Sequence, residues 1–476
     1  MLEKVYKRFR QSPDALRKVM YLIPIERRLG GLSFSRRLRS IKETDKLPKE
    51  ELLKIQEREL AKLLNYAVKN IPYYKNIELD SSKDAFSNLL KFPIIDKETI
   101  QKCPDLFINK NIPISKRYSV TTGGTSGNTL QFYLDNSTYG EEWAFIVSMW
   151  GRVNYTPGDR IAAFRGVEFN HITKDKFWQL NPLYNALEFS PFHMSEKNLP
   201  HYLSAMKKWH PSFIHGYPSA VNLLAHYLDT NQKSDISKIN AVLAGSENIY
   251  PGQIEFIEKA LNTRFFSWYG QSEKVILAGE CEHSHIYHIF PQYGYTEIID
   301  DNGEIISWEN VGKRGELVGT GFLNNVMPFI RYKTGDFATI AGWGCKDCGR
   351  DYPLIKDVRG RWTQEMIVSK NGAQISMTAL NMHSDAFQNV RLFQFYQEKK
   401  GEVVLHIIRK DTYTDNDSQN ILQALHQKMG EDVQVQLQFV DEIPRTKSGK
   451  YKFLIQKLSN GNKDDKSLWN CSGIIK

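Results

Sequence analysis

No apolar run in the chain comes near the roughly 20 residues that a membrane-spanning helix needs. The apolar stretch at residues 20–25 is short and lies among arginines, so we expect neither a membrane span nor a signal peptide. Cysteine is also scarce, with five scattered through 476 residues. A chain this long with so few cysteines has no disulfide framework, and a cytoplasmic location suits it.

The chain is rich in residues that fill buried cores. Hydrophobic residues make up 41% of it, and it holds nine tryptophans and 23 tyrosines. Its length exceeds what one core usually serves, so we expect at least two domains. The net charge of +9 is concentrated in the first fifty residues and does not form a patterned stripe. We therefore predict anionic small-molecule ligands such as ATP and no nucleic-acid partner.

Basic and apolar residues are interleaved in the N-terminal segment. The basic ones are Lys4, Lys7, Arg8, Arg10, Arg17, Lys18, Arg27, Arg28, Arg36, Arg37 and Arg39. The segment is either an amphipathic helix that makes a peripheral contact with an anionic membrane or a helix that packs on the main domain with a solvated basic face. We prefer the second interpretation.

Short apolar runs at residues 161–164, 213–215 and 239–244 alternate with helical patterns at 220–228 and 254–260. This alternation predicts an α/β fold with parallel strands crossed by helices.

Residues 286–308 favour antiparallel strands instead. A turn signal, Asp300-Asp301-Asn302-Gly303, separates strand-like runs at 295–299 and 304–306, and we expect a smaller β-rich subdomain here.

The last quarter of the chain has a mixed α+β pattern. Strands are expected at 391–396, 403–409 and 433–439, with a helix at 418–428. We therefore divide the chain into a basic helical segment (1–50), a large N-terminal domain (51–361), a small mobile α+β domain (362–458) and a flexible polar tail (459–476).

Three short segments suit one nucleoside triphosphate. They are Thr121-Thr122-Gly123-Gly124-Thr125-Ser126-Gly127, Tyr269-Gly270-Gln271-Ser272-Glu273 and Tyr332-Lys333-Thr334-Gly335-Asp336. Backbone N–H groups and hydroxyls of the first can surround phosphate oxygens without a bulky Cβ. The others offer an aromatic face and two carboxylates. Taken alone, the first segment is also compatible with an ordinary turn.

A fourth segment, Pro444-Arg445-Thr446-Lys447-Ser448-Gly449-Lys450, places a lysine after a Ser-Gly turn. Such a loop can bring one ammonium group to a developing phosphate charge, although by itself it also fits a solvated basic loop.

Together these segments resemble the adenylate-forming superfamily, and within it the phenylacetate–CoA ligase-like branch that includes members of capsular-polysaccharide pathways. The resemblance covers most of the chain. Its further parts are the helix and aromatic pair at residues 63–74, His215-Gly216-Tyr217-Pro218-Ser219-Ala220, Ala244-Gly245-Ser246-Glu247 and Gly360-Arg361.

The resemblance implies roles for the nucleotide segments. Residues 122–128 would bind the β- and γ-phosphates, but Asn128 stands where the family loop usually ends in lysine. Tyr269 would stack on adenine, Ser272 would bind the α-phosphate and Glu273 would hold Mg²⁺. Asp336 would accept hydrogen bonds from the ribose hydroxyls, and Arg361 would bind the nucleotide at a second point. Residues 245–247 would follow the adenine edge, although Glu247 is equally compatible with a solvated charge.

The resemblance makes Lys450 the residue that drives formation of an acyl-adenylate from ATP and a carboxylate. The C-terminal domain would then rotate and open the route for a second acceptor. The hinge after Arg361 reads Trp362-Thr363-Gln364-Glu365 and lacks the paired aspartates common in relatives, so rotation is less firmly predicted than adenylation.

The acyl group would bind near Arg165, His215, Gly216 and Tyr217. Arg165 suggests a polar or anionic acid, or else it pairs with Glu168 within the chain.

A second cluster has the chemistry of a structural zinc site. Cys345 and Cys348 have the spacing that lets two thiolates bind one Zn²⁺, and Cys281, His283 and His288 offer further ligands. We expect one of the two histidines to complete the site. The alternative is that Cys345 and Cys348 only border a glycine-rich turn.

The main hypothesis is an ATP- and Mg²⁺-dependent, AMP-forming ligase that transfers an acyl group to CoA or to an amine such as a sugar amine. The alternative is a catalytically weak nucleotide-binding scaffold of a membrane-proximal glycan-assembly complex. The acid, the acceptor and the oligomeric state are left open.

Overall fold

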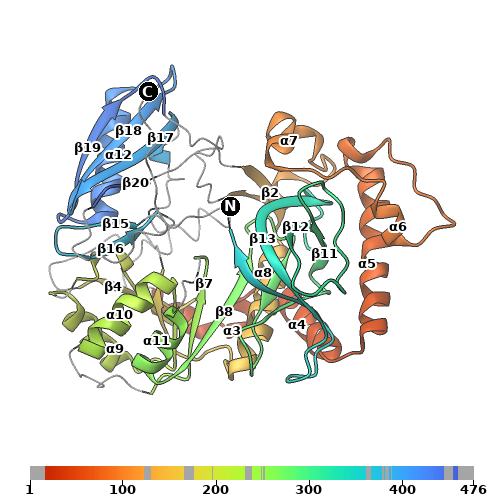
Figure 1. The fold of residues 1–476 in the computed structure, drawn as a ribbon, viewed down its shortest axis with the longest axis horizontal. Helices are drawn as coiled ribbons and strands as arrows, with labels where there is room; N and C mark the ends of the chain where they lie inside the picture. The colour runs from red at the N-terminus through yellow and green to blue at the C-terminus, as the bar shows by residue number, and fades with distance from the viewer. Residues whose placement is uncertain are drawn as a thin grey trace.

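The computed structural model describes residues 17–122, 130–165, 176–195, 197–230, 238–247, 249, 252–360, 366–377, 380, 385–387, 389–443 and 454–458. A 12-stranded sheet with flanking helices forms the larger part, and a four-stranded sheet lies beside it (Figure 1). This mixed α/β architecture agrees with the predicted fold class. Among the described residues, no helix combines the length and hydrophobicity required to cross a bilayer.

The large sheet joins parallel and antiparallel strands. Its order is β11 (Gly294–Ile299), β12 (Arg314–Gly321), β13 (Tyr332–Trp343), β14 (Pro353–Arg359), β10 (Tyr287–Ile289), β9 (Leu277–Gly279), β8 (Arg264–Gly270), β7 (Ala241–Gly245), β6 (Phe213–Gly216), β3 (Ile161–Phe164), β5 (Ala186–Phe189) and β4 (Trp178–Asn181). Strands β5, β3, β6, β7 and β8 are parallel.

The parallel strands are short apolar runs because both of their faces are buried. Successive side chains of a strand point to opposite faces, and β3 shows this directly. Ala162 and Phe164 pack with the helices on one face, whereas Ile161 and Ala163 pack with those on the other. The predicted strands and helices of this region are thus confirmed to within a few residues.

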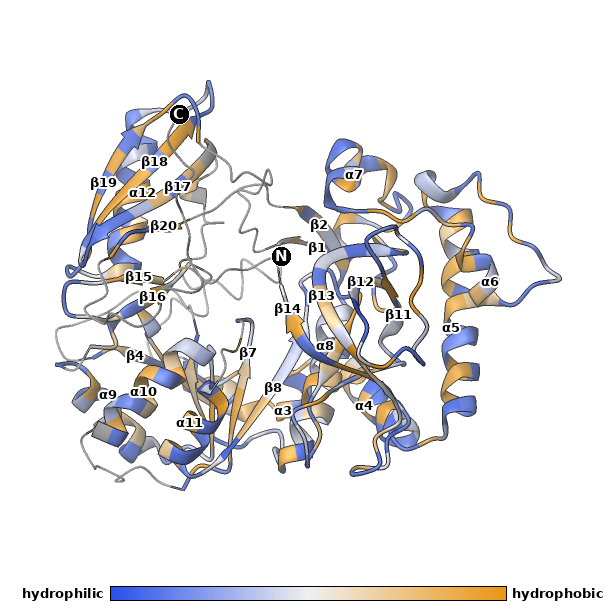
Figure 2. Cartoon of the chain, viewed as in Figure 1, coloured by the Kyte–Doolittle hydropathy of each residue, from blue (hydrophilic) through white to orange (hydrophobic). Residues whose placement is uncertain are grey.

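Helices cover both faces of the sheet. The α-helices of the described residues are α3 (Ile25–Arg28), α4 (Leu32–Thr44), α5 (Lys49–Asn70), α6 (Ala85–Leu89), α7 (Lys97–Lys102), α8 (Thr138–Trp150), α9 (Leu199–Trp209), α10 (Pro218–Thr230), α11 (Gln253–Leu261) and α12 (Asp415–Met429), the last of which belongs to the second sheet. Helices α9, α10 and α11 share a core with one face of the parallel strands, and α4 and α8 share a core with the other. Helix α5, along which apolar and polar residues alternate in Figure 2, packs on the antiparallel strands.

The antiparallel strands continue the same sheet. Strand β9 pairs with β8, so the predicted β-rich region is joined to the parallel strands by backbone hydrogen bonds. Residues 300–303 form the expected turn, in which Gly303 has a φ of +85°. The run at 304–306 contributes only a bridge between Ile299 and Ile305 and is not a strand of the sheet.

The N-terminal segment is not one long helix. From residue 17 it forms a 3-10 turn (Lys18–Leu22), the short α3 and then α4, which packs against α8. Leu29, Phe34 and Ile41 are buried in the core that α4 and α8 share. Packing on the main body, the interpretation preferred from sequence, is therefore confirmed for residues 17–44.

The second sheet has the order β19 (Gln434–Phe439), β18 (Glu402–Arg409), β17 (Val390–Lys399) and β20 (Leu454–Gln456), with α12 packed on it. A hairpin of β15 (Met366–Val368) and β16 (Gln374–Ser376) lies between this sheet and α10. Near this junction the ring of His193 lies against Gly430, where an added Cβ would come 3.2 Å from the ring.

Candidate active site

The carboxyl ends of β3, β6, β7 and β8 meet at one edge of the large sheet. The residues that directly follow these strands are Arg165, Tyr217, Ser246 and Gln271. Each belongs to a segment that the sequence singled out. In open α/β sheets, ligands bind outside the carboxyl ends of the strands. This edge therefore gathers the expected nucleotide-binding and acid-binding segments.

The predicted phosphate loop connects β1 (Arg117–Thr121) and β2 (Gln131–Asp135), which form an antiparallel hairpin. The Thr122 N–H donates to the carbonyl of Leu130 at 2.9 Å, and the Leu130 N–H donates to Thr122 Oγ1 at 3.0 Å. Thr122 thus closes the base of the loop. Gly123, Gly124, Thr125, Ser126 and Gly127 lie outside the described residues.

Tyr269 and Asp336 are in direct contact. The Tyr269 hydroxyl donates to Asp336 Oδ2 at 2.8 Å, and Gln271 Nε2 donates to the Tyr269 hydroxyl at 2.7 Å. Burial, reinforced by the Asp336 carboxylate, raises the pKa of Tyr269 well above its ordinary value, so the phenol stays a hydrogen-bond donor. The strands β8 and β13 thereby bring together the residues expected at the base and at the ribose.

Glu273 lies just beyond this pair. Its Oε1 accepts a hydrogen bond from the Tyr332 hydroxyl at 2.9 Å. Burial raises the pKa of Glu273, and Lys97 and Lys274 act in the opposite direction. A partly buried carboxylate of this kind is stabilised by a cation, and an anionic oxygen is the ligand that Mg²⁺ prefers. The residues present therefore fit the magnesium expected from the sequence.

Glu247 and Gly245 take structural roles at the same edge. A carboxylate oxygen of Glu247 accepts the Ser219 N–H at 3.1 Å, at the start of α10, so this residue is more than a solvated charge. Gly245 lies against the ring of Trp268, where a Cβ would come within 3.0 Å of ring atoms. Gly270 is the last residue of β8, and Ser272 lies in the segment that follows this strand.

The residues expected around the acyl group also meet. Arg165 Nη1 donates to His215 Nε2 at 3.1 Å, and Arg165 Nη2 donates to Ser246 Oγ at 2.9 Å. The Arg165 guanidinium lies 5.4 Å from the centroid of the Tyr217 ring. Gly216 ends β6 so close to Phe164 that a Cβ would lie 2.9 Å from its carbonyl oxygen.

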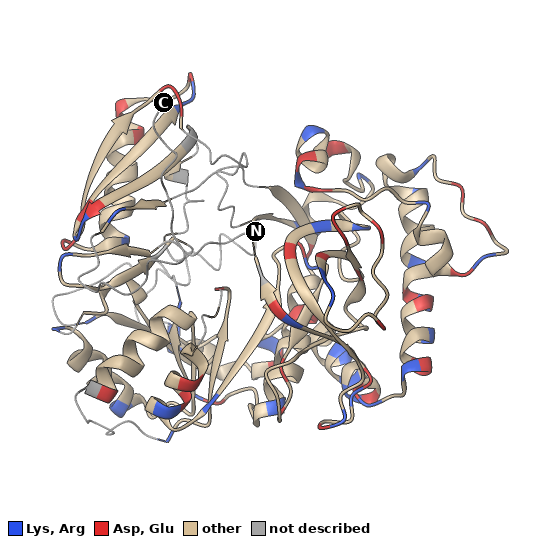
Figure 3. Cartoon of the chain, viewed as in Figure 1, with Lys and Arg blue, Asp and Glu red and all other residues tan. Residues whose placement is uncertain are grey.

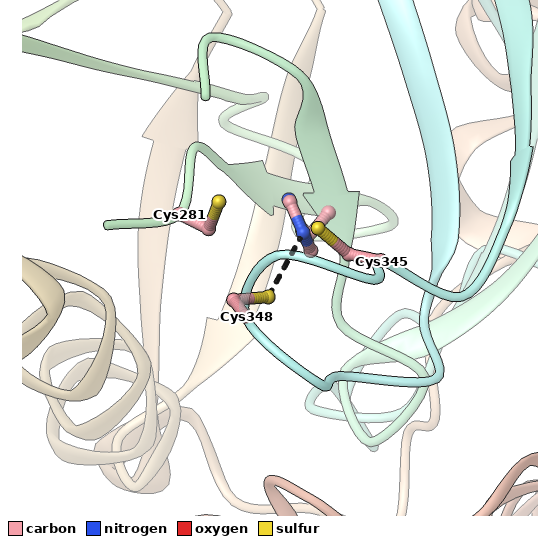
Figure 4. Close-up of side chains that lie close together, drawn as sticks. Cys281, Cys345 and Cys348 are labelled. Carbon is pink, nitrogen blue, oxygen red and sulfur yellow. Dashed lines mark hydrogen bonds between the residues drawn. The ribbon is translucent and has the colours of Figure 1, made fainter. Parts of the chain in front are cut away.

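Four of the five expected zinc ligands form one cluster. The ligand atoms of Cys281, His288, Cys345 and Cys348 all lie within 4.8 Å of one another. Figure 4 shows the three cysteine side chains around a common centre, with a hydrogen bond of 3.4 Å between Cys348 Sγ and His288 Nε2. His283 is outside the cluster, and its backbone N–H donates to Cys281 Sγ at 3.4 Å.

The surroundings of the cluster suit a tetrahedral metal ion. His288 Nδ1 donates to the carbonyl of Ile286 at 2.9 Å, which leaves the Nε2 lone pair directed at the thiols. A turn holds the two neighbouring cysteines, in which the Gly349 N–H donates to the Cys345 carbonyl at 2.9 Å and Gly349 has a φ of +70°. Three sulfur ligands and one imidazole are a donor set typical of structural zinc.

Some expected residues cannot be placed, and some contacts were not foreseen. Arg361 and Lys450 lie outside the described residues. The contact of Tyr332 with Glu273 was not expected, although Tyr332 belongs to the segment 332–336. The rings of Trp150 and Trp268, whose centroids lie 5.0 and 5.5 Å from that of His215, were not expected there either. No local signal marks these tryptophans, because they reach His215 from separate elements.

The chain is similar to known proteins over most of its length. Residues 367–457 match the family model described as the CapK C-terminal domain. Protein CapK of Staphylococcus aureus is 25% identical over 420 residues, which cover 86% of this chain and 90% of that protein. Phenylacetate-coenzyme A ligase of Thermus thermophilus is 25% identical over 338 residues, which cover 68% of this chain and 74% of the relative. The chain belongs to the adenylate-forming superfamily.

Within the superfamily, the chain falls in the phenylacetate–CoA ligase-like branch and is an AMP-forming ligase. Solved structures support the fold of this ligase. A structure of 2-hydroxyisobutyryl-CoA ligase with 2-HIB-AMP and CoA in the thioesterification state aligns with a TM-score of 0.55 at 16% identity, covering 88% of this chain and 92% of that chain. A second structure of the same enzyme, in the postadenylation state, has a TM-score of 0.53 at 17% identity and covers 87% and 91%.

Proposed function

We propose that this ligase activates a carboxylic acid with ATP and transfers the acyl group to CoA or to an amine. The observation that carries the proposal is the hydrogen bond between Tyr269 and Asp336, with Glu273 beside them at the edge of the parallel strands. A carboxylate that only accepts hydrogen bonds suits the ribose hydroxyls of ATP. The aromatic ring suits the base.

In the first half-reaction, an oxygen of the acid attacks the α-phosphorus of ATP. The bond from that phosphorus to the bridging oxygen breaks, and pyrophosphate leaves with the electron pair. Mg²⁺ held by Glu273 would neutralise charge on the phosphate oxygens. Lys450 donates hydrogen bonds to the acid and α-phosphate oxygens as charge builds, and one such donor contributes roughly 3–4 kcal/mol. Residues 123–127 bind the β- and γ-phosphates, and Arg361 makes a further contact with the nucleotide.

The direct test is ATP–pyrophosphate exchange with pooled amino, hydroxy and aryl acids. We expect acid-dependent exchange in the wild type, loss of it in Lys450→Ala, and retention of it in Lys447→Ala, which removes a lysine from the same loop. Release of ADP and phosphate in place of AMP and pyrophosphate would contradict the proposal, as would equal exchange in the Lys450→Ala and Lys447→Ala variants.

The acceptor is either CoA or an amine. The resemblance to capsular-polysaccharide members, together with the match to Protein CapK over 86% of the chain, favours a sugar amine. The match to phenylacetate-coenzyme A ligase favours CoA. Once the acid is known, consumption of the CoA thiol and formation of an amide mass separate the two.

We further propose that Cys281, His288, Cys345 and Cys348 hold a structural Zn²⁺. All four ligands come from the protein, so no coordination position is open for a substrate. Two come from the β9–β10 hairpin and two from the connection between β13 and β14, and the ion would therefore tie these segments together.

A peripheral contact with an anionic membrane is a proposal for the N-terminal segment. Val19, Leu22 and Leu32 are 57%, 84% and 74% exposed, and exposed basic residues, Lys18, Arg27 and Arg36, lie between or beside them in the chain. Figure 3 shows Lys and Arg along α3 and α4. Apolar side chains flanked by cations are what an anionic lipid surface attracts.

Removing residues 1–40 is a poor test of this contact, because Leu29 and Phe34 are part of the core. Flotation with vesicles that contain phosphatidylserine should instead compare the wild type with Leu22→Asp/Leu32→Asp. We expect the double variant to lose binding, and Ile305→Asp, at an exposed apolar site elsewhere, to keep it. Equal flotation of all three proteins would contradict the contact. Membrane binding without any exchange activity would instead support the scaffold alternative.

A further inference from the structure

Arg165 is held in place by neutral groups. Its two terminal nitrogens donate to His215 Nε2 and to Ser246 Oγ, and its guanidinium lies 5.4 Å from the centroid of the Tyr217 ring. No carboxylate forms an ion pair with Arg165 among the residues that the structure describes. Its charge is therefore uncompensated within that part of the chain.

His215 does not share this charge, and it accepts the hydrogen bond. A guanidinium has no acceptor atom, so the Nε2 atom of His215 carries a lone pair and not a proton. Burial and the neighbouring guanidinium lower the pKa of His215 well below its ordinary value, which keeps the ring neutral. The rings of Trp150 and Trp268 pack against His215. The cation consequently stands in a fixed position beside aromatic surfaces.

The position of Arg165 suits a second group of the substrate. The residue follows β3, which is three strand spacings from β8, and β8 ends in the nucleotide segment 269–273. The guanidinium itself reaches back along the edge, because Nη2 donates to Ser246 Oγ, and Ser246 follows β7, the strand that pairs with β8. A short acid bound beside the nucleotide segment can therefore place a second carboxylate at the guanidinium.

We infer that Arg165, positioned by His215 and Ser246, binds a second carboxylate of the acid that this ligase activates, so that its substrates are dicarboxylic acids. The inference rests on the proposed function. Two of the five N–H groups of Arg165 are used by His215 and Ser246, and the remaining ones are available to a ligand. Hydrogen bonds from a guanidinium to a carboxylate are among the strong ones in proteins, and a cation partly removed from water favours an anion over a neutral hydroxyl.

The test compares acids of matched shape in ATP–pyrophosphate exchange: succinate with butyrate, and terephthalate with 4-methylbenzoate. We expect the dicarboxylate of at least one pair to have a kcat/KM about tenfold or more above its partner. A clear preference for the monocarboxylate in both pairs would overturn the inference while leaving the proposed function intact. A stronger response to 4-hydroxybutyrate than to succinate would also overturn it.

Variants of Arg165 test whether this residue causes the preference. Arg165→Met should abolish the difference in kcat/KM between the paired acids, and Arg165→Lys should keep part of this difference. Arg160→Met, at the residue directly before the same strand, should leave the ratio of kcat/KM unchanged. If the ratio appears only after Glu168→Gln, Arg165 is paired within the chain and the inference is wrong. If Arg165→Met raises the KM for ATP and does not change the ratio, the anion is a nucleotide phosphate, which also overturns it.

Direct binding separates this inference from the proposed function. Calorimetric titration of the nucleotide-free protein with succinate and terephthalate needs no exchange activity. We expect binding in the wild type and in Arg160→Met, weakened about tenfold or more in Arg165→Met. If no acid supports exchange but this pattern is seen, the proposed function fails and the dicarboxylate site stands. Absence of binding in the wild type, or equal binding in all three proteins, overturns the site.

Discussion

Tyr332 donates a hydrogen bond to Glu273, with 2.9 Å between the phenol oxygen and Oε1. The two residues are far apart in the sequence, and the pairing of β8, β9, β10, β14 and β13 in one sheet brings them together. Tyr332 is 3% exposed, and its ring stacks on Phe329 with 5.2 Å between the ring centroids. The phenol therefore has little freedom and orients the carboxylate expected to hold Mg²⁺.

The first prediction concerns this contact. Tyr332→Phe keeps the ring and removes the hydroxyl, so Glu273 loses a fixed orientation. Loss of an outer-shell partner weakens metal binding by about tenfold or more, and we expect the Mg²⁺ concentration for half-maximal exchange to rise accordingly. Tyr155→Phe, at another buried tyrosine, serves as the control and should behave like the wild type. An unchanged Mg²⁺ dependence of Tyr332→Phe would show that the hydroxyl has no positioning role.

The second prediction concerns Asp336. Asp336→Asn keeps the size of the side chain but replaces one acceptor oxygen with a donor, so we expect the KM for ATP to rise about tenfold or more. With 2′,3′-dideoxy-ATP, which lacks both ribose hydroxyls, the wild type and the variant should differ little. A difference of equal size with both nucleotides would place the effect of Asp336 elsewhere, for example in its hydrogen bond with Tyr269.

The third prediction concerns the metal. The wild type should contain about one equivalent of zinc by mass spectrometry of the purified protein, because four ligand atoms are already gathered. Cys348→Ser should lose the zinc and unfold at a lower temperature. Cys103→Ser changes a free cysteine outside the cluster and should keep both the zinc and the stability. The site would be contradicted if the purified wild type contained no metal and if adding zinc did not raise its unfolding temperature.

The fourth prediction concerns His193, near the junction with the second sheet. Burial lowers the pKa of His193 to about 4; Asp432 opposes this and His426 reinforces it. The folded state therefore favours the neutral His193 ring. The neutral ring contributes its full share of the folding stability above pH 6.5, and this share is lost as the pH falls toward 4. At pH 5 the loss is about 2 kcal/mol.

Unfolding by urea at pH 7 and pH 5 measures this effect. His193→Gln has no charge to gain, so its stability should fall less between the two pH values than that of the wild type. His201→Gln, at a histidine of α9, serves as the control and should follow the wild type. A fall of the same size in all three proteins would assign the pH dependence to other groups.

Much of the local structure could be predicted from the sequence. The apolar run at 161–164 became β3, the helical pattern at 220–228 lies within α10, and the Asp300-Asp301-Asn302-Gly303 signal is a turn. Each of these features depends on backbone preference and periodicity within a few residues. The run at 304–306 has the same local character as a strand, but it forms only a bridge between Ile299 and Ile305.

The candidate sites, too, have some features that the sequence predicts and others that depend on the tertiary structure. The sequence by itself determined that two cysteines at 345 and 348 can share one ion and that Tyr269, Glu273 and Asp336 have the chemistry of a nucleotide site, because residue type and short spacing carry that information. Only the tertiary structure decided between His283 and His288, since the register of β9, β10 and β14 sets which imidazole lies beside the thiols. It likewise decided that Tyr332 meets Glu273 and that Arg165 meets His215 and Ser246, because contacts between distant segments depend on the order and register of the strands.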